Sequence, residues 1–247
     1  MTKSAVLMSG HPRNFEKSFT QFKKILPDSD FYALLLNVTN SVEKTKNPTN
    51  ANDITNTQNY LEQLSKEDNF FYSFVGDEEI DMDQYRTCVS LFNHFDIPGK
   101  TFQQITEKWL RQVNDYKRSF EWMSSHNKQY DLVYRIRPDL IVKKNDYILD
   151  RDIDKFNCFH QTTNIDQVND KFFYSNFNNM QKFMVGMIDS LKNDKIGSIT
   201  NSRFNVEQYL YRYLKHLNFN LNFISTNNFY MKKIMTDGEE LCAGFPS

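Results

Sequence analysis

Three charged side chains stand at alternate positions inside an apolar stretch of the sequence. Arg135, Arg137 and Asp139 lie in the segment 130–142, which is otherwise rich in Leu, Val, Ile and Tyr, as in a buried strand. Since side chains alternate across a strand, a regular strand would carry these charges on one face. Unpaired charges are costly in mid-sheet, so we expect them near the strand's end, which Pro138 marks because it cannot donate to a sheet ladder. Ligands bind outside the carboxyl ends of strands in open α/β sheets, so the pattern predicts a binding site.

A second polar cluster follows another short apolar run. Residues 5–8 are predicted to form a buried strand that runs into a turn containing Gly10 and His11, with Arg13 shortly after it. Arginine binds phosphate through a bidentate fork, and Gly10 lets the backbone approach a ligand closely. The two clusters together indicate an anionic ligand. The alternative for the charged strand is a buried Arg–Asp pair that only ties two elements together.

The single carboxylate of the charged strand suits a divalent cation. Mg²⁺ and Mn²⁺ prefer oxygen ligands and often use only one or two carboxylates while they bridge phosphate oxygens. We therefore expect Asp139 to be a ligand of Mn²⁺ or Mg²⁺. Zinc is not expected, because the five histidines show neither HxH nor HExxH spacing, and Cys88, Cys158 and Cys242 form no CxxC pair.

Strands and helices alternate around these clusters. Phe15, Phe19, Phe22 and Leu26 form an apolar stripe that predicts a helix, with Asn14 as its N-cap. Further strands are predicted at 31–36, 70–75 and 156–160, and further helices at 60–64, 102–125, 178–191 and 205–217, the second of these opened by a capping box from Thr101 to Gln104. Residues 39–57, rich in Asn, Thr and Lys, are expected to form an exposed loop. The order predicts an α/β fold with a mixed, largely parallel sheet sandwiched by helices.

Composition excludes several classes of protein. The chain has 247 residues, of which 39% are hydrophobic and 25% charged, as in a globular domain and unlike a disordered chain. Thirty basic and 31 acidic residues leave a net charge of −1, so broad nucleic-acid binding is not expected. No apolar run is long enough for a signal peptide or a transmembrane segment, so we expect a cytoplasmic protein. The 22 Phe and 13 Tyr are expected mainly to fill the core.

The order of motifs resembles a known family. A first strand ends in Ser9-Gly10-His11-Pro12-Arg13-Asn14-Phe15, a later strand carries Arg135-Ile136-Arg137-Pro138-Asp139, and the motifs Asp170-Lys171-Phe172-Phe173-Tyr174 and Val206-Glu207-Gln208-Tyr209-Leu210 follow. This order, over roughly residues 4–217, resembles the bacterial and large-DNA-virus glycosyltransferases of the GT-A fold in which an R-x-R-x-D strand motif replaces Asp-x-Asp.

The resemblance implies a nucleotide-diphosphate sugar as donor and a glycan or glycolipid as acceptor, as in polysaccharide biosynthesis. Gly10, His11 and Arg13 would then lie near the nucleotide and diphosphate, Asn37 near the base or ribose, and Asp139 at the metal or the donor sugar. It also implies a single domain over 1–247, with nucleotide binding in about 1–142 and acceptor binding in about 143–247. Arg137 stands where Asp-x-Asp would have its first carboxylate, so its guanidinium is an alternative to a metal for neutralising the diphosphate.

Two later acids are candidates for catalysis on the acceptor side. Asp170 precedes an aromatic run, and Glu207 opens a predicted helix. An inverting sugar transfer needs a base for the acceptor hydroxyl, which either carboxylate could supply, although the helix dipole alone would favour Glu207 at its position. Phe173 and Tyr174 are candidates for stacking on a sugar, with core packing as the alternative.

Two other functions fit the same sequence. The chain could be a catalytically silent GT-A domain that binds carbohydrate or serves a structural role. It could also be a sugar nucleotidyltransferase, although the turn after residues 5–8 lacks the Gly-rich phosphate loop that such enzymes tend to carry. The sequence contains no G-x-S-x-G, GxxxxGK[ST] or G-x-G-x-x-G motif, so serine hydrolase, P-loop and dinucleotide-binding functions are not expected.

Overall fold

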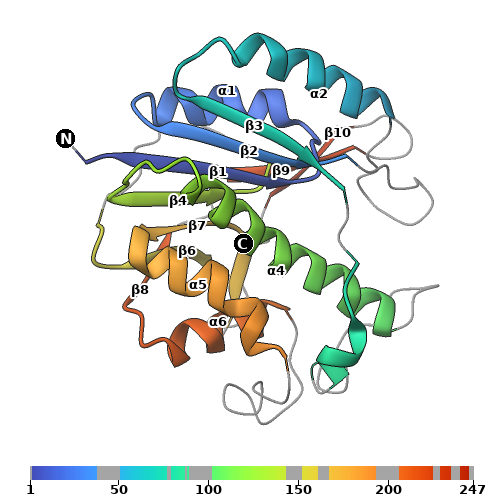
Figure 1. The fold of residues 1–247 in the computed structure, drawn as a ribbon, viewed down its shortest axis with the longest axis vertical. Helices are drawn as coiled ribbons and strands as arrows, with labels where there is room; N and C mark the ends of the chain where they lie inside the picture. Colours follow the sequence, from blue (N-terminus) through green and yellow to red (C-terminus); the bar gives the residue numbers. More distant parts are fainter. Residues whose placement is uncertain are drawn as a thin grey trace.

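The structure, a computed structural model, describes residues 2–37, 51–76, 79–86, 88, 102–142, 152–160, 167–192, 206–224, 229–234 and 240–244. Its strands are β1 (Ser4–Gly10), β2 (Asp30–Leu36), β3 (Phe70–Val75), β4 (Leu132–Ile136), β5 (Leu140–Val142), β6 (Phe156–His160), β7 (Val168–Asn176), β8 (Leu221–Ile224), β9 (Phe229–Ile234) and β10 (Glu240–Gly244). Its helices are α1 (Phe15–Ile25), α2 (Ala51–Leu64), the short 3-10 helix η2 (Met82–Tyr85), α4 (Phe102–Ser124), α5 (Phe177–Ser190) and α6 (Val206–His216). Figure 1 shows how these elements are arranged.

A mixed sheet of seven strands forms the centre of the fold. Its strand order is β3-β2-β1-β4-β7-β6-β8, and β1, β2, β3 and β4 run parallel to one another. Strand β7 is antiparallel to both β4 and β6, whereas β6 and β8 are parallel. The predicted α/β fold with a largely parallel sheet is therefore confirmed. Strands β10, β9 and β5 make a second, smaller sheet.

Helices cover both faces of the central sheet (Figure 1). On one face, α1 and α2 pack on alternate side chains of β1, including Val6 and Met8. On the other face, α4, α5 and α6 pack on the intervening side chains, including Ala5 and Leu7. Because β1 is buried on both faces, its central residues Ala5–Met8 are all apolar instead of alternating with polar residues. The charged residues at the strand ends are consequently held by a rigid, close-packed frame.

The helices follow the predicted apolar stripes, and Asn14 is the N-cap residue of α1, as predicted, but its side chain does not cap the helix. Phe15, Phe19 and Phe22 are buried, as expected for the inner face of α1. Asn14 adopts the left-handed conformation, with φ of 51°, and its side chain makes no capping hydrogen bond. The turn is closed by the backbone instead, because the N–H of Phe15 donates to the carbonyl of Pro12 over 3.1 Å. Thr101, in the predicted capping box, lies outside the described residues.

The predicted single strand over 130–142 is wrong in one respect. Strand β4 ends at Ile136, and after a turn the chain enters β5, which pairs with β9 in the smaller sheet. The turn is closed by a hydrogen bond of 3.0 Å from the Leu140 N–H to the Arg137 carbonyl. Pro138 lies within this turn, so its predicted role as the end of the strand is confirmed.

The expected loop over 39–57 is partly helix. Helix α2 begins at Ala51, and residues 38–50 lie outside the described residues. Ile54, Thr57 and Leu61 are buried at spacings of three and four, which is the repeat of one helical face. Strands β7, β8, β9 and β10 were not predicted from the sequence.

Candidate functional site

The ends of three central strands meet at one edge of the sheet. Gly10, the last residue of β1, has φ of 126°, and a Cβ on it would lie 3.8 Å from the Pro138 Cδ in the turn after β4. Strand β7 runs the opposite way, so its beginning, not its end, reaches the same edge. The Arg137 N–H accordingly donates to the Lys171 carbonyl over 2.9 Å. This antiparallel pairing is what carries Asp170 to the charged residues of the R-x-R-x-D motif.

Arg137 joins two carboxylates. Its Nε donates to Asp139 Oδ1 over 2.9 Å and its Nη2 donates to Asp139 Oδ2 over 2.7 Å, which makes a bidentate fork. Its Nη1 lies 3.5 Å from Asp170 Oδ2. The Asp139 side chain is only 4% exposed, whereas that of Arg137 is 23% exposed. The guanidinium is thus the member of the group that a ligand can reach most easily.

Arg135 lies beneath this group and is 2% exposed. Its guanidinium carbon is 4.5 Å from the centre of the Tyr116 ring, a cation–π arrangement, and its Nη1 donates to the Asp170 carbonyl. Gln112, one turn from Tyr116 on α4, donates to Asp170 Oδ2 over 2.6 Å. The backbone and carboxylate of Asp170 are therefore both fixed by neighbouring side chains. Arg135 itself reaches a bound molecule only through Asp170.

The basic neighbours keep both carboxylates ionised. Burial alone would raise the pKa of Asp170, but the charges of Arg137, Lys171 and Arg135 lower it to about 2. Burial likewise opposes ionisation of Asp139, yet the charge and hydrogen bonds of Arg137 hold its pKa below the usual value. These acids are consequently weak bases at neutral pH, and Asp170 is better suited to pairing than to proton transfer.

His11 lies beside the same charges. Burial, followed by the positive charges of Arg13, Lys108 and Arg137, lowers the pKa of His11 to about 4. The imidazole is therefore neutral at neutral pH. A neutral side chain here adds hydrogen-bonding capacity to the turn after β1 without adding charge.

The surroundings of the two carboxylates carry a net positive charge. Among the described residues that influence one another here, five are basic and three acidic, for a formal charge of +2: Arg13, Lys108, Arg135, Arg137 and Lys171 against Asp139, Asp170 and Glu207. Such an excess, at the edge of a sheet and partly buried, favours a small anion.

Glu207 is the third acid of the site. Burial and the charge of Asp170 raise the pKa of Glu207, although Lys171 and a backbone hydrogen bond oppose this. It stands in the first turn of α6, as predicted, and the charge of Asp170 acts on it. The raised pKa makes Glu207 a stronger base than either aspartate.

Asn37, Phe173 and Tyr174 are the remaining candidates from the sequence, and of these Phe173 has the Arg135 guanidinium carbon 5.6 Å from its ring centre. Asn37 is exposed just after β2, at the same edge of the sheet, where its N–H donates to the Val75 carbonyl over 2.8 Å. Phe173 and Tyr174 are fully buried between the sheet and its helices. Core packing, the alternative to sugar stacking, is therefore the role that the structure gives to both.

The residues around Asp139 fit a divalent cation poorly. Both oxygens of Asp139 accept hydrogen bonds from Arg137, and the nearest second carboxylate, Asp170, pairs with the same guanidinium. In the part of the chain that the structure describes, no three His, Cys, Asp or Glu side chains come together as metal ligands. A cation placed between these acids would meet the charge of Arg137 at close range.

Sequence reasoning missed several residues of the site. Gln112 and Tyr116 belong to the apolar-striped helix α4 and hold Asp170 and Arg135, while Lys108 and Lys171 contribute charge. Spacing on α4 places residues 108, 112 and 116 on one face, but nothing in the sequence shows that this face meets the end of β4.

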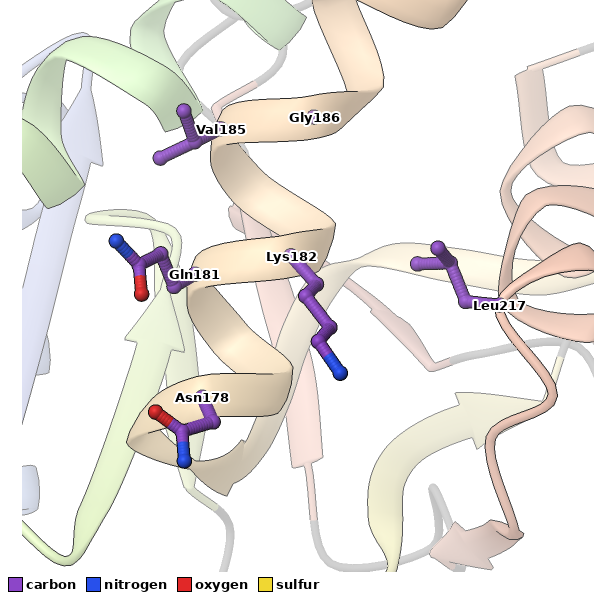
Figure 2. Close-up of a pocket in the computed structure, with 6 residues that line it drawn as sticks. All are labelled: Asn178, Gln181, Lys182, Val185, Gly186 and Leu217. Carbon is purple, nitrogen blue, oxygen red and sulfur yellow. The ribbon is translucent and has the colours of Figure 1, made fainter.

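A groove lies elsewhere on the molecule, between α5 and the end of α6 (Figure 2). It has a volume of about 480 Å³ and is open to solvent. Its lining residues are Asn178, Gln181, Lys182, Val185, Gly186 and Leu217. None of the predicted site residues lines it, so the candidate site rests on the charged edge of the sheet.

Comparison with known proteins supports the fold. No family model matches the chain, and no curated protein matches it significantly in sequence. A nucleoside-diphosphate-sugar pyrophosphorylase from Vibrio cholerae has a similar structure, with a TM-score of 0.50 and 10% sequence identity over 95% of this chain and 97% of that chain. The glycosyltransferase GlyE of Streptococcus pneumoniae gives a TM-score of 0.45 at 10% identity, over 90% of this chain and 45% of that chain. The first likeness shows a shared fold. Among the described helices, none has the length and apolar character needed to cross a bilayer.

Proposed function

We propose that this protein is a glycosyltransferase that moves a sugar from a nucleotide-diphosphate donor to a glycan or glycolipid acceptor. The observation that carries the proposal is the net positive charge at the carboxyl edge of β1 and β4, where Arg137 is partly exposed between Asp139 and Asp170. In open α/β sheets this edge is where ligands bind, and a diphosphate is the kind of anion that arginine recognises.

The donor lies across the ends of β2, β1 and β4 in this proposal. Arg13 and Arg137 contact the diphosphate. Gly10, which lies beside Pro138, has no side chain and so lets the backbone approach the diphosphate; any other residue would be strained at its φ of 126°. Asn37 lies toward the base or ribose, and Asp139 toward the donor sugar. Arg135 acts as a positioning residue, since it fixes Asp170 from beneath.

The reaction breaks the bond between the anomeric carbon and the diphosphate oxygen and joins that carbon to the acceptor oxygen. Positive charge at Arg137 stabilises the departing diphosphate. The acceptor hydroxyl loses a proton, which Glu207 accepts because its raised pKa makes it the better base. Asp170, held ionised, orients Arg137. Residues of about 1–142 thus bind the nucleotide and residues of about 143–247 the acceptor, within one functional unit.

A thermal-shift panel tests the donor site. UDP, GDP, ADP, CDP and dTDP are each added to the full chain, and at least one should raise the melting temperature, since ligand bound to the folded state stabilises it. The shift should be lost in Arg137→Gln and kept in Lys182→Ala, whose side chain lies in the groove beside α5. Asp139→Ala should abolish both hydrolysis of the matching nucleotide sugar and transfer. A panel without any shift would overturn the donor assignment.

The same preparations separate the two other functions. Release of pyrophosphate from a sugar phosphate and a nucleoside triphosphate would identify a sugar nucleotidyltransferase. Glycan binding by calorimetry without any nucleotide binding would identify a catalytically silent carbohydrate-binding module.

A further inference from the structure

We infer that the diphosphate site works without a divalent cation, because Arg137 occupies the position between Asp139 and Asp170 that a cation would take. The inference rests on the proposed function for the identity of the ligand. It reverses the metal expected at Asp139 from the sequence, and it concerns which group supplies positive charge to the diphosphate.

The Arg137 guanidinium is surrounded by carboxylate oxygens. Its three nitrogens all face carboxylate oxygens, with Nε and Nη2 on Asp139 at 2.9 and 2.7 Å and Nη1 3.5 Å from Asp170. A fork of this kind uses one lone pair on each oxygen of Asp139, so a metal at Asp139 would have to share the carboxylate with Arg137. The guanidinium would then be a second positive charge within a few ångströms of the metal, which opposes metal binding.

The positive charge of Arg137 is permanent. A guanidinium stays protonated throughout the pH range of folded proteins, and here carboxylates of Asp139 and Asp170 lie against it. A bound metal can leave or be chelated, whereas this cation is part of the chain.

The Arg137 guanidinium is accessible to a bound diphosphate. The Arg137 side chain is 23% exposed, and its hydrogen bonds to Asp139 and Asp170 use three of the five N–H groups of the guanidinium. The other two N–H groups can donate to a phosphate oxygen. Arg13 and Lys108 influence the same region, since both lower the pKa of the neighbouring His11. Their charges offset those of the two aspartates, so the site can accept a diphosphate without an added ion.

Two measurements on the unaltered chain test the inference. Calorimetry with the nucleoside diphosphate found in the thermal-shift panel should give dissociation constants that agree within about twofold in EDTA, Mg²⁺ and Mn²⁺. The electron paramagnetic resonance signal of free Mn²⁺, recorded without nucleotide, should not fall when the protein is added. Affinity about tenfold weaker in EDTA, or bound Mn²⁺ that is lost in Asp139→Asn, would overturn the inference.

A charge-reversing variant sharpens the test. Arg137→Asp removes the built-in cation and adds a third carboxylate beside Asp139 and Asp170, a set that suits Mn²⁺. We expect it to bind Mn²⁺, to bind the nucleoside diphosphate about tenfold more weakly in EDTA, and to recover affinity when Mn²⁺ is present. Lys182→Asp makes the same charge change on α5 and should alter neither measurement.

The outcomes distinguish the inference from the donor proposal. If no nucleoside diphosphate binds under any condition, the donor proposal fails, and the Mn²⁺ signal alone decides the inference. Mn²⁺ bound by the unaltered chain would then contradict it, and Mn²⁺ bound only by Arg137→Asp would support it. If Arg137→Asp does not fold, as judged by circular dichroism, the measurements on the unaltered chain still decide the question.

Discussion

Arg135 and Arg137 stand two residues apart and have different roles. Arg135 belongs to β4 and is buried against the Tyr116 ring, where its guanidinium donates a hydrogen bond to the Asp170 carbonyl. Arg137 follows the last residue of β4 and is partly exposed, with its charge shared between two side-chain carboxylates. The strand's end, between the two residues, separates a group that supports the site from a group that can contact a ligand.

Glu207→Gln should separate binding from transfer. The amide cannot accept the proton of the acceptor hydroxyl, so we expect transfer to fall by about a hundredfold or more while donor affinity changes by less than about twofold. In the unaltered chain, kcat/KM should decline as the pH falls through the raised pKa of Glu207, because a base acts only when it is deprotonated. Steady-state kinetics over a range of pH check both points.

The control is Glu121→Gln, which makes the same change on an exposed face of α4. A Glu207→Gln variant that transfers as fast as the unaltered chain would exclude Glu207 as the base. An equal loss of donor affinity and rate would instead give Glu207 a binding role.

At the scale of elements, the helices and strands with a clear apolar periodicity could be predicted from the sequence, and those without one could not. Helices α1, α4 and α6 have strong apolar stripes and were predicted. Only residues 60–64 of α2 were predicted, because Asn and Thr, weak helix formers, make up five of the nine residues 51–59. Strand β7 was missed because Asp170 and Lys171 interrupt its apolar pattern. Those same two residues belong to the site. A strand that carries functional charges at its beginning is poorly predicted by hydrophobicity for that very reason.

The site could be predicted only in part for a related reason. The pair Arg137 and Asp139 is two residues apart in sequence, so local spacing revealed it. The contact of Arg137 with Asp170 depends on β7 running antiparallel to β4, which no local pattern encodes. The burial of Arg135 likewise depends on Tyr116, which comes from a different element.

The packing of α5 on α6 depends on a glycine. A Cβ on Gly186 would lie 2.7 Å from the Tyr213 hydroxyl, which is too close without movement, and Gly186 also borders the groove in Figure 2. Gly186→Ala should therefore lower the free energy of unfolding by about 1 kcal/mol, even though alanine favours helix. Removing the hydroxyl makes room, so Gly186→Ala should be neutral or stabilising in a Tyr213→Phe background. Urea denaturation of the four proteins of this cycle measures the coupling. Equal costs of Gly186→Ala in both backgrounds would show that the close contact is relieved at no cost.

At the scale of the whole molecule, the net charge of −1 conceals a strongly uneven distribution. Positive charge is concentrated where the ends of β1 and β4 meet the beginning of β7. The central sheet that carries these strands has a hydrophobic core on each face, and each core contains both aromatic and aliphatic side chains. Groups held in this frame have pKa values that depend on folding, so the stability of the entire protein is linked to the site. The acids and the histidine of the site affect the free energy of unfolding in different ranges of pH.

His11 should contribute to the loss of stability in mild acid. Its pKa is about 4 in the folded protein and 6.5 in a model peptide, so the unfolded chain binds the proton more tightly. The folded state is therefore favoured fully above pH 6.5 and loses this advantage as the pH falls toward 4. We expect the free energy of unfolding to fall by about 1–2 kcal/mol between neutral pH and about pH 5 on account of His11. Asp170 contributes in the same direction only at lower pH, because its pKa drops from 3.8 to about 2 on folding.

Urea denaturation of His11→Asn at the same pH values isolates this contribution. The variant should lose markedly less stability than the unaltered chain on going from neutral pH to about pH 5, since asparagine takes up no proton. His216→Asn, a change at an exposed position near the end of α6, should retain the full loss. Parallel pH dependence in His11→Asn and the unaltered chain would mean that burial and the charges of Arg13, Lys108 and Arg137 do not hold His11 neutral. The positive excess at this edge of the sheet would then lose the support that the lowered pKa of His11 gives it.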